Sequence, residues 1–234
     1  MAKTISMLAR VLQLLAPRAC SVCGCRLSGE EEVICCTCDL DLPRTSYASD
    51  AYENEMAKLF WVRLPIERAA ALFFYHAHSK ATRIIFELKY HDHPEIGEKM
   101  GLFAAREMAS SHFFDGIDLI VPVPLAKKRL RQRGYNQSEW IAKGISAFTG
   151  IPVMTDIVGR ESFKGSQTAL QRWGRAENVE NVFNLLRPEV IHGKHVLIVD
   201  DVCTTGATIT ACGKELAKAG DLRVSVFTLA FAIH

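Results

Sequence analysis

A predicted strand that ends in two aspartates and a threonine-rich turn constrains this chain more than any other stretch. Residues 196–199 are β-branched or aliphatic, the pattern of a strand buried on both faces of a sheet. Asp200 and Asp201 follow and are expected to close the strand. Apolar residues then recur at helical spacing from Ile209, and Gly220 is a stop signal. The sequence therefore predicts strand, loop and helix in that order.

The loop between this strand and helix has the composition of a phosphate site. Glycine lets backbone N–H groups turn toward an anion, threonine hydroxyls add donors, and the helix N-terminus adds a favourable dipole. The residues expected to hold the phosphate are Thr204, Thr205, Gly206, Ala207 and Thr208. Asp200 and Asp201 would meet the hydroxyls of a ribose or the Mg²⁺ shell of a polyphosphate. A Walker A loop is excluded by spacing, whereas an ordinary strand–glycine–helix turn is the structural alternative.

Six of the eight cysteines lie between positions 20 and 38. Cys20 with Cys23, and Cys35 with Cys38, form two C-x-x-C pairs, each able to present two thiolates to one tetrahedral ion. A segment this short has almost no core of its own, so a structural Zn²⁺ ion is expected to stabilise it. A disulfide cluster is the alternative, which the absence of a secretion signal disfavours because the cytosol keeps thiols reduced.

Other candidate metal or redox groups are weaker. Cys25 or Cys36 could replace a neighbouring ligand, but the regular spacing of the two pairs makes them the spare thiols. A redox C-x-x-C would need one pair at a helix start in a βαβ unit. His91 and His93 are expected to be solvated loop residues, because no third ligand stands at a useful spacing.

A dense cluster of cations follows a strand predicted over residues 119–125, and this strand ends in prolines. Its members are Lys127, Lys128, Arg129, Arg131 and Arg133. Open α/β sheets bind ligands at the carboxyl ends of their strands, which favours a binding role over a solvated surface. The cations would neutralise a pyrophosphate, aided by a helix that begins near Asn136, or would track a phosphodiester backbone with Tyr135 stacking on a base.

The remaining elements complete an α/β pattern. We expect strands at residues 69–75, 151–158 and 223–231, and helices at 81–90 and 95–111. Residues 159–177 are predicted to form a polar hairpin that carries cations over the phosphate crevice. This hairpin is interpreted either as a lid that excludes water or as an ordinary exposed loop.

Size and charge limit the function classes. With 234 residues, nearly half of them hydrophobic, the chain has room for one domain and a small module. A net charge of +2 is too small to argue for nucleic-acid or membrane binding by bulk field alone. Ile5, Leu8, Leu12 and Leu15 predict a packed or docking helix rather than a signal peptide. No run approaches the ~18 apolar residues of a membrane span, so we expect a cytoplasmic protein.

In this order the segments resemble the ComF/GntX family, competence-associated proteins that join a zinc module to a type I phosphoribosyltransferase domain. The resemblance rests on the cysteine pairs, Leu88, Lys89 and Tyr90, Val121 to Pro124, Arg133 to Gln137, the stretch 167–183 with Arg172 and Arg175, and residues 199–208. It implies a mostly parallel sheet flanked by helices. The expected domains are an N-terminal helix and four-cysteine zinc module at 1–45, a linker at 46–65 and the phosphoribosyltransferase-like domain at 66–234.

The resemblance implies a site for phosphoribosyl pyrophosphate (PRPP) with Mg²⁺. Asp200 and Asp201 would contact the ribose hydroxyls or Mg²⁺, and residues 204–208 would hold the 5′-phosphate. Lys89, Arg133, Arg172 and Arg175 would contact pyrophosphate or belong to the flexible loop. Two departures from the family pattern are Cys203 inside the PRPP loop and the Trp173-Gly174 pair in the hairpin.

The same resemblance implies a role in handling single-stranded DNA during natural transformation, with competence-machinery proteins as partners. Two hypotheses follow. One is a PRPP-dependent phosphoribosyltransferase that acts on a small nitrogenous acceptor. The other is a non-catalytic DNA-uptake adaptor that binds the phosphate backbone of single-stranded DNA. No residue in the sequence names the acceptor.

Overall fold

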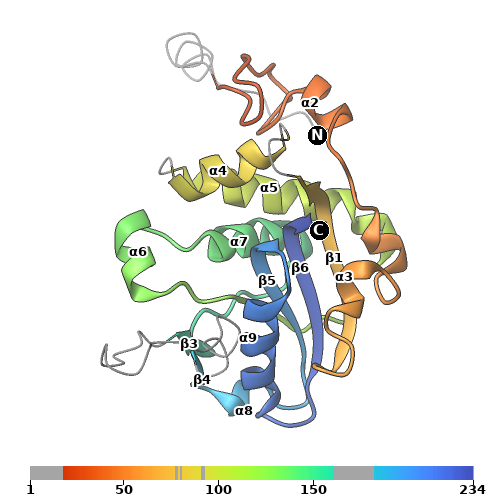
Figure 1. Cartoon of the computed structure of the whole chain (residues 1–234), viewed down its shortest axis with the longest axis vertical. Coiled ribbons are helices and arrows are strands. Elements are labelled where there is room, and N and C mark those ends of the chain that lie inside the picture. The colour runs from red at the N-terminus through yellow and green to blue at the C-terminus, as the bar shows by residue number, and fades with distance from the viewer. Residues whose placement is uncertain (1–17, 77–78, 80, 91–92, 161–181, 234) are drawn as a thin grey trace, which may run out of the picture.

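A four-stranded parallel sheet forms the centre of the molecule (Figure 1). The computed structural model describes residues 18–76, 79, 81–90, 93–160 and 182–233. The sheet order is β1-β6-β5-β2, with β1 (Ile66–Tyr75), β2 (Leu119–Pro122), β5 (His195–Cys203) and β6 (Arg223–Ala232). The predicted α/β class with a parallel sheet is therefore confirmed.

Helices cover both faces of the sheet, which is why β5 is apolar on both sides. Val196 and Ile198 pack into the core on one face, and Leu197 and Val199 pack into the core on the other. Alternate residues of a strand point to opposite faces, so one continuous apolar run serves both cores.

Among the described helices, three pack on the face of the sheet that carries Leu197 and three on the face that carries Val196. The first group is α4 (Thr82–Tyr90), α5 (Pro94–Glu107) and α7 (Gln137–Thr149). The second group is α3 (Glu55–Lys58), α8 (Pro188–Ile191) and α9 (Ala207–Ala217). Ile84, Ile85 and Leu88 of α4 are buried, as their spacing predicted.

Helices α5 and α7 pack unusually closely because glycines stand at their crossing. A Cβ atom placed on Gly101 would lie 2.1 Å from the carbonyl oxygen of Ile141, and one on Gly144 would lie 1.9 Å from that of Glu98. The crossing sets α7 closely against α5, and α7 in turn packs on β5 and β2 of the sheet.

The strand predicted at residues 151–158 is wrong. Val153 makes a single bridge to Ile120, and the chain then leaves the sheet. β3 (Val158–Arg160) instead pairs antiparallel with β4 (Phe183–Leu185) in a separate two-stranded sheet. Pro152 has no N–H group to lengthen the ladder, and the neighbouring strand β2 is itself short and ends at a proline.

Two other elements differ from expectation. β5 does not close at the aspartates but continues to Cys203, because Val202 and Cys203 pair with Ala230 and Phe231 of β6. The cation cluster forms a helix, α6 (Lys127–Arg133), which was not expected from the sequence. Its residues are good helix formers, and Gly134 ends it with a φ of 78°.

The segment before the sheet is structured. It contains the 3₁₀ helix η1 (Tyr47–Asp50) and α3, and Met56 and Phe60 are completely buried. A second 3₁₀ helix, η2 (Ala109–Ser111), follows α5, and α2 (Cys36–Leu40) lies in the cysteine-rich segment. The domain boundaries at 45/46 and 65/66 stay a prediction. The predicted N-terminal helix lies outside the described residues, as does the part of the predicted hairpin that follows residue 160.

None of the helices that the structure describes combines the length and the apolar composition needed to cross a bilayer.

Candidate ligand cleft and metal centre

A cavity of about 360 Å³ opens where β1, β2 and β5 end. Open parallel sheets bind ligands at this edge, because the loops that follow the strands converge there. Its acidic and hydroxyl groups are Asp200, Asp201, Ser138, Thr204 and Thr208. Its cations are Lys89, Arg129, Arg133 and Arg160. The structure therefore brings the predicted aspartates and threonines together with Lys89 and Arg133.

Asp200 is held by donors on one side of its carboxylate. Its Oδ1 atom accepts a hydrogen bond from the Ser138 hydroxyl at 2.9 Å and another from the Asp201 N–H at 2.9 Å. The Oδ2 atom of Asp201 lies 3.2 Å from Lys89 Nζ. Ser138 is at the start of α7 and Lys89 at the end of α4, so two helices position the acidic pair.

The carboxyl group of Asp200 is costly to ionise in the folded protein. Burial, followed by the adjacent charge of Asp201, raises the pKa of Asp200 to about 7. Its hydrogen bond from Ser138 and the charge of Lys89 oppose this increase without cancelling it. A carboxylate that is costly to ionise in the free protein is one that a ligand hydroxyl donor or a cation would stabilise.

The predicted phosphate loop turns at Gly206 directly into helix α9. Gly206 has a φ of 71°, and a Cβ atom there would lie 2.9 Å from the Phe60 ring. Only glycine fits both restraints. α9 begins at the next residue, Ala207, and no described side chain caps its first turn. Thr204 and Thr205 are exposed, so N–H and hydroxyl donors are available to a ligand.

A second, larger cavity of about 710 Å³ adjoins the first. It is lined by Lys89, Tyr90, Arg129, Gln132, Arg133, Gly134 and Tyr135, so three cations line both cavities. The guanidinium of Arg133 lies 5.5 Å from the centroid of the Tyr90 ring, and the Tyr135 hydroxyl donates to the Leu88 carbonyl at 2.6 Å. These contacts tie the loop after α6 to the end of α4.

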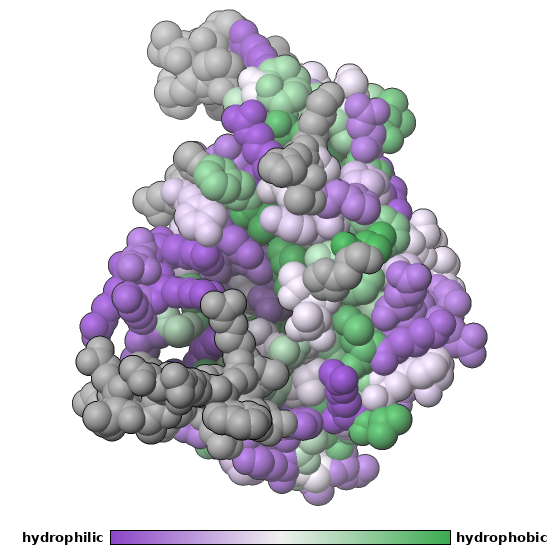
Figure 2. Space-filling view, viewed as in Figure 1, coloured by the Kyte–Doolittle hydropathy of each residue, from purple (hydrophilic) through white to green (hydrophobic). Residues whose placement is uncertain are grey.

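Helix α6 forms an exposed cationic rim beside the cleft. None of its residues is buried. Figure 2 shows hydrophilic side chains gathered at the side of the molecule where Figure 1 places α6. Its position suits either of the two roles expected from the sequence, pyrophosphate binding or contact with a phosphodiester backbone.

Two residues that line the cleft had no predicted role, and two predicted site residues lie outside the described part of the chain. Ser138 and Gln137 line the cleft without having been given a role, and their one sequence signal was a place at the start of a helix after the cation cluster. Gln137 is buried and its Nε2 atom has no partner among the described residues. Arg172 and Arg175 lie outside the described residues.

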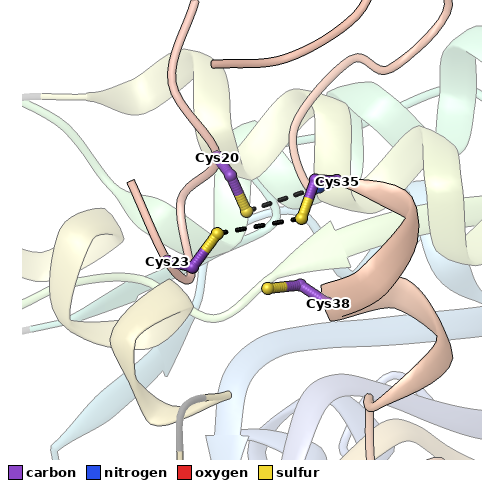
Figure 3. A group of neighbouring side chains, drawn as sticks. All are labelled: Cys20, Cys23, Cys35 and Cys38. Carbon is purple, nitrogen blue, oxygen red and sulfur yellow. Dashed lines mark hydrogen bonds between the residues drawn. The ribbon is translucent and has the colours of Figure 1, made fainter. Parts of the chain in front are cut away.

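The four predicted metal ligands converge in the N-terminal segment (Figure 3). The sulfur atoms of Cys20, Cys23, Cys35 and Cys38 all lie within 4.8 Å of one another. Those of Cys23 and Cys35 are 3.7 Å apart. Four thiolates around one Zn²⁺ ion, each at ~2.3 Å, stand about 3.8 Å from one another. The cluster could therefore hold a metal ion, and its donor set fits zinc.

The local backbone brings the two cysteine pairs together. Gly24 turns with a φ of 76°, and the N–H groups of Val22 and Cys35 donate to the Cys20 sulfur. Glu31 accepts from the N–H groups of Ser28 and Cys36, each at 2.6 Å, which closes the loop between the pairs. Donors to a sulfur atom stabilise the thiolate form that a metal requires.

Among the described residues, the weaker metal candidates, the two spare cysteines and the histidine pair, are not part of a metal-binding cluster. Cys25 and Cys36 are exposed thiols outside the four-residue cluster. His93 lies 2.9 Å from Glu95, and His91 lies outside the described residues. Cys203 and Cys212 are buried, and burial raises the pKa of the Cys203 thiol to about 12.

Comparisons with known proteins match this geometry. Residues 75–234 match the phosphoribosyl transferase domain family. The chain is 34% identical to competence protein F of Haemophilus influenzae over 130 residues, 55% of this chain and 57% of that protein. It is 31% identical to DNA utilization protein YhgH of Escherichia coli strain K12 over 149 residues, 62% of this chain and 65% of that protein. It is 29% identical to competence protein ComFC of Bacillus subtilis over 112 residues, 47% of this chain and 43% of that protein. The matched part thus spans less than two thirds of each of these relatives.

Proposed function

The chain belongs to the phosphoribosyl transferase domain family and, within it, to the ComF family, and on that premise we propose that its cleft binds PRPP together with Mg²⁺. The observation that carries the proposal is the convergence, in one cavity, of a paired carboxylate, an uncapped helix start with threonine donors, and four cations. These are the groups that a sugar diol, a phosphate monoester and a pyrophosphate require.

Each part of the ligand has a partner of matching chemistry in this proposal. Asp200 and Asp201 accept from the ribose hydroxyls, and residues 204–208 hold the 5′-phosphate by N–H and hydroxyl donors. Lys89, Arg129 and Arg133 face the pyrophosphate, since they line both cavities. Carboxylate and phosphate oxygens suit Mg²⁺, which when bound would neutralise pyrophosphate charge. The protein groups orient the ligand and exclude water from the ribose.

We assign the four-cysteine cluster to structural zinc. Four thiolates leave no open coordination position, so the metal would stabilise the module rather than take part in catalysis. The cysteine-rich segment lies against helices α4 and α5 (Figure 1), and none of the four cysteines lines the cleft.

For the biological role, we propose that the protein acts in the uptake or handling of single-stranded DNA during natural transformation. The names of its relatives, competence protein and DNA utilization protein, support this role. Transfer of the phosphoribosyl group to a nitrogenous acceptor is the catalytic form of the proposal. The exposed helix α6 favours a second candidate, a non-catalytic adaptor that binds the phosphate backbone of single-stranded DNA.

Calorimetric titration with PRPP tests the ligand assignment. The metal-loaded protein should bind PRPP with micromolar affinity in the presence of Mg²⁺ and more weakly without it. The double variant Asp200→Asn, Asp201→Asn should lose this binding while keeping its fold by circular dichroism. Absence of PRPP binding by the unaltered protein would refute the proposal and favour the adaptor.

Salt dependence separates the two candidates. Each phosphate contact with single-stranded DNA contributes about −0.7 to the slope of log K against log salt, so binding along α6 should weaken steeply between 50 and 200 mM NaCl. PRPP held by hydrogen bonds and Mg²⁺ should weaken less. The double aspartate variant should keep or strengthen DNA binding, because it removes negative charge from the cleft. Equal loss of both ligands in a folded variant would argue against separate modes.

A further inference from the structure

We infer that Arg160 is the cation that binds the 5′-phosphate of the ligand, and thereby selects phosphorylated over unphosphorylated ribosyl compounds. The inference rests on the proposed function and deepens it. Residues 204–208 are Thr-Thr-Gly-Ala-Thr and contain no cation, so the loop offers only dipoles to a group that carries a charge of about −1.5 to −2 at neutral pH. A guanidinium from elsewhere in the fold would complete this subsite.

Arg160 is placed beside that loop by contacts from two directions. Its Nη1 atom donates to the Pro124 carbonyl over 3.5 Å, and its guanidinium lies 5.1 Å from the centroid of the Phe183 ring. β3 and β4 contact α9, as Figure 1 also shows. Arg160 lines the same cavity as Thr204 and Thr208.

The charge of Arg160 has no ion-pair partner among the residues that the structure describes. Its Nε atom is buried and has no hydrogen-bond partner among the described residues. Across the described residues, no carboxylate forms an ion pair with it, although Asp200 attracts it over a longer distance. Burial, followed by the like charge of Arg129, lowers its pKa. Half-buried cations without an anion are costly, so a bound phosphate oxygen would relieve a strain that the free cleft carries.

Arg160 faces the monoester rather than the pyrophosphate because of its place in the cleft. Lys89, Arg129 and Arg133 line both cavities, whereas the described residues around the larger cavity do not include Arg160. Of the four cations, Arg160 is thus the one that lines the smaller cavity alone. A guanidinium has five donors, of which one donates to a described residue, and it binds phosphate in a bidentate fork that lysine cannot form.

Two simple ligands distinguish the two ends of the cleft. Ribose 5-phosphate carries the monoester alone, and inorganic pyrophosphate with Mg²⁺ carries the other group. We would measure their Kd values by calorimetry for the unaltered protein, Arg160→Gln, Arg160→Lys and the matched control Arg129→Gln, each checked for an unchanged fold by circular dichroism and thermal unfolding. The two glutamine variants remove one guanidinium each from the same cavity.

Arg160→Gln should weaken ribose 5-phosphate by about 10- to 100-fold, since hydrogen bonds to charged groups are the strong ones, and change pyrophosphate by less than about threefold. Arg160→Lys should recover part of the loss, and Arg129→Gln should show the reverse selectivity. Equal loss of both ligands in Arg160→Gln, or loss of pyrophosphate alone, would overturn the assignment while leaving the proposed function intact. Failure of the unaltered protein to bind either ligand would refute both.

Discussion

Asp200 shows how one residue ties the stability of this cleft to its ligand. Its carboxylate is set among a Ser138 hydroxyl, the Asp201 N–H and the Asp201 charge, and burial raises its pKa to about 7. Because the folded pKa lies above the ordinary value of 3.8, ionisation opposes folding. Its contribution to stability is therefore complete below pH 3.8 and is lost as the pH rises through about 7.

Replacing this carboxylate should stabilise the ligand-free protein while removing ligand binding. Asparagine keeps an oxygen for the Ser138 and Asp201 donors but carries no charge. We expect Asp200→Asn to raise the free energy of unfolding at pH 8 by about 1–3 kcal/mol, with a smaller gain at pH 5. Asp201→Asn is the control and should stabilise less, because it removes the charge that raises the Asp200 pKa but also leaves Lys89 without its partner. Denaturant unfolding at both pH values would check this, and a loss of stability in Asp200→Asn at pH 8 would contradict it.

His195 gives a pH dependence of the opposite sign. It is buried at the start of β5, where its Nδ1 lies 3.1 Å from the Gly116 carbonyl and its Nε2 lies 2.8 Å from the Ser225 hydroxyl. This pairing fits a neutral ring that donates from Nδ1 and accepts at Nε2. Burial, followed by the charges of Arg223 and Arg68, lowers its pKa. The stability it provides is complete above the ordinary pKa of 6.5 and is lost as the pH falls through the lower folded value.

We therefore expect His195→Gln to be less stable than the unaltered protein by about 1–3 kcal/mol at pH 7.5, and the difference to narrow toward pH 5. His192→Gln, at an exposed position, is the control and should change the free energy of unfolding at pH 7.5 by less than about 0.5 kcal/mol. Urea unfolding from pH 7.5 to 5 measures both variants. Parallel curves for the unaltered protein and His195→Gln would show that another group titrates.

At the scale of elements, the crossing of α5 and α7 depends on glycine rather than on helix propensity. Elsewhere in a helix, exchanging glycine for alanine gains roughly 0.5–1 kcal/mol. At Gly144 the new Cβ atom would lie 1.9 Å from the Glu98 carbonyl oxygen, which is backbone and cannot move alone. We expect Gly144→Ala to destabilise the protein by about 3 kcal/mol or more, on the order of a severe overpacking.

The matched control is Gly213→Ala in α9, where the nearest atoms are the ends of the Leu64 side chain at 2.7 and 2.8 Å. That side chain can rotate, so we expect a change within about 1 kcal/mol. Thermal unfolding of the two variants compares them directly. Equal effects would mean that backbone approach does not determine the packing of α5 on α7.

Elements with a strong local pattern could be predicted from the sequence, and those decided by distant partners could not. The run at 196–199 required two covered faces, and the structure supplies them. Residues 151–158 were as apolar as a strand, but their pairing depended on a short neighbour and on β4, which comes much later in the chain. The close approach at Gly101 and Gly144 has no signal in a single sequence, because it depends on which two helices cross.

The cleft followed the same rule. The aspartates, the threonine loop and the two cysteine pairs are each contiguous in sequence, so composition and spacing located them. Ser138 reaches Asp200 across 62 positions, and the pairing of β3 with β4 that carries Arg160 into the cavity was not predicted, although Arg160 itself was expected in a hairpin over the phosphate crevice. Such residues become visible only when the fold places them.

At the scale of the whole molecule, the cysteine module is fastened to the helices that shape the cleft. Arg44 lies 2.7 Å from Glu107 of α5 and also pairs with Asp39 of the module. Arg106 of α5 lies 3.6 Å from Glu32, and Arg83 of α4 donates to the Val22 carbonyl over 3.4 Å. Helix α4 also carries Lys89, so it connects the module to the cleft. The described residues of the module do not line the cleft.

Removal of the metal should therefore unfold the cysteine module before it disturbs the cleft. We expect Cys23→Ser to lose about one bound zinc per chain by atomic absorption, and the control Cys25→Ser to retain it. Hydrogen exchange with a strong chelator should lose protection over residues 18–42 before β5 and β6. Loss of zinc in Cys25→Ser, or simultaneous loss of protection in both regions, would contradict this account.

A crystal structure with PRPP and Mg²⁺ would show whether the carboxyl edge of the sheet holds a phosphoribosyl ligand. We expect the 5′-phosphate at residues 204–208 beside Arg160, the ribose hydroxyls on Asp200 and Asp201, and the pyrophosphate toward Lys89, Arg129 and Arg133. PRPP bound elsewhere, or an empty cleft in crystals grown with saturating ligand, would contradict it.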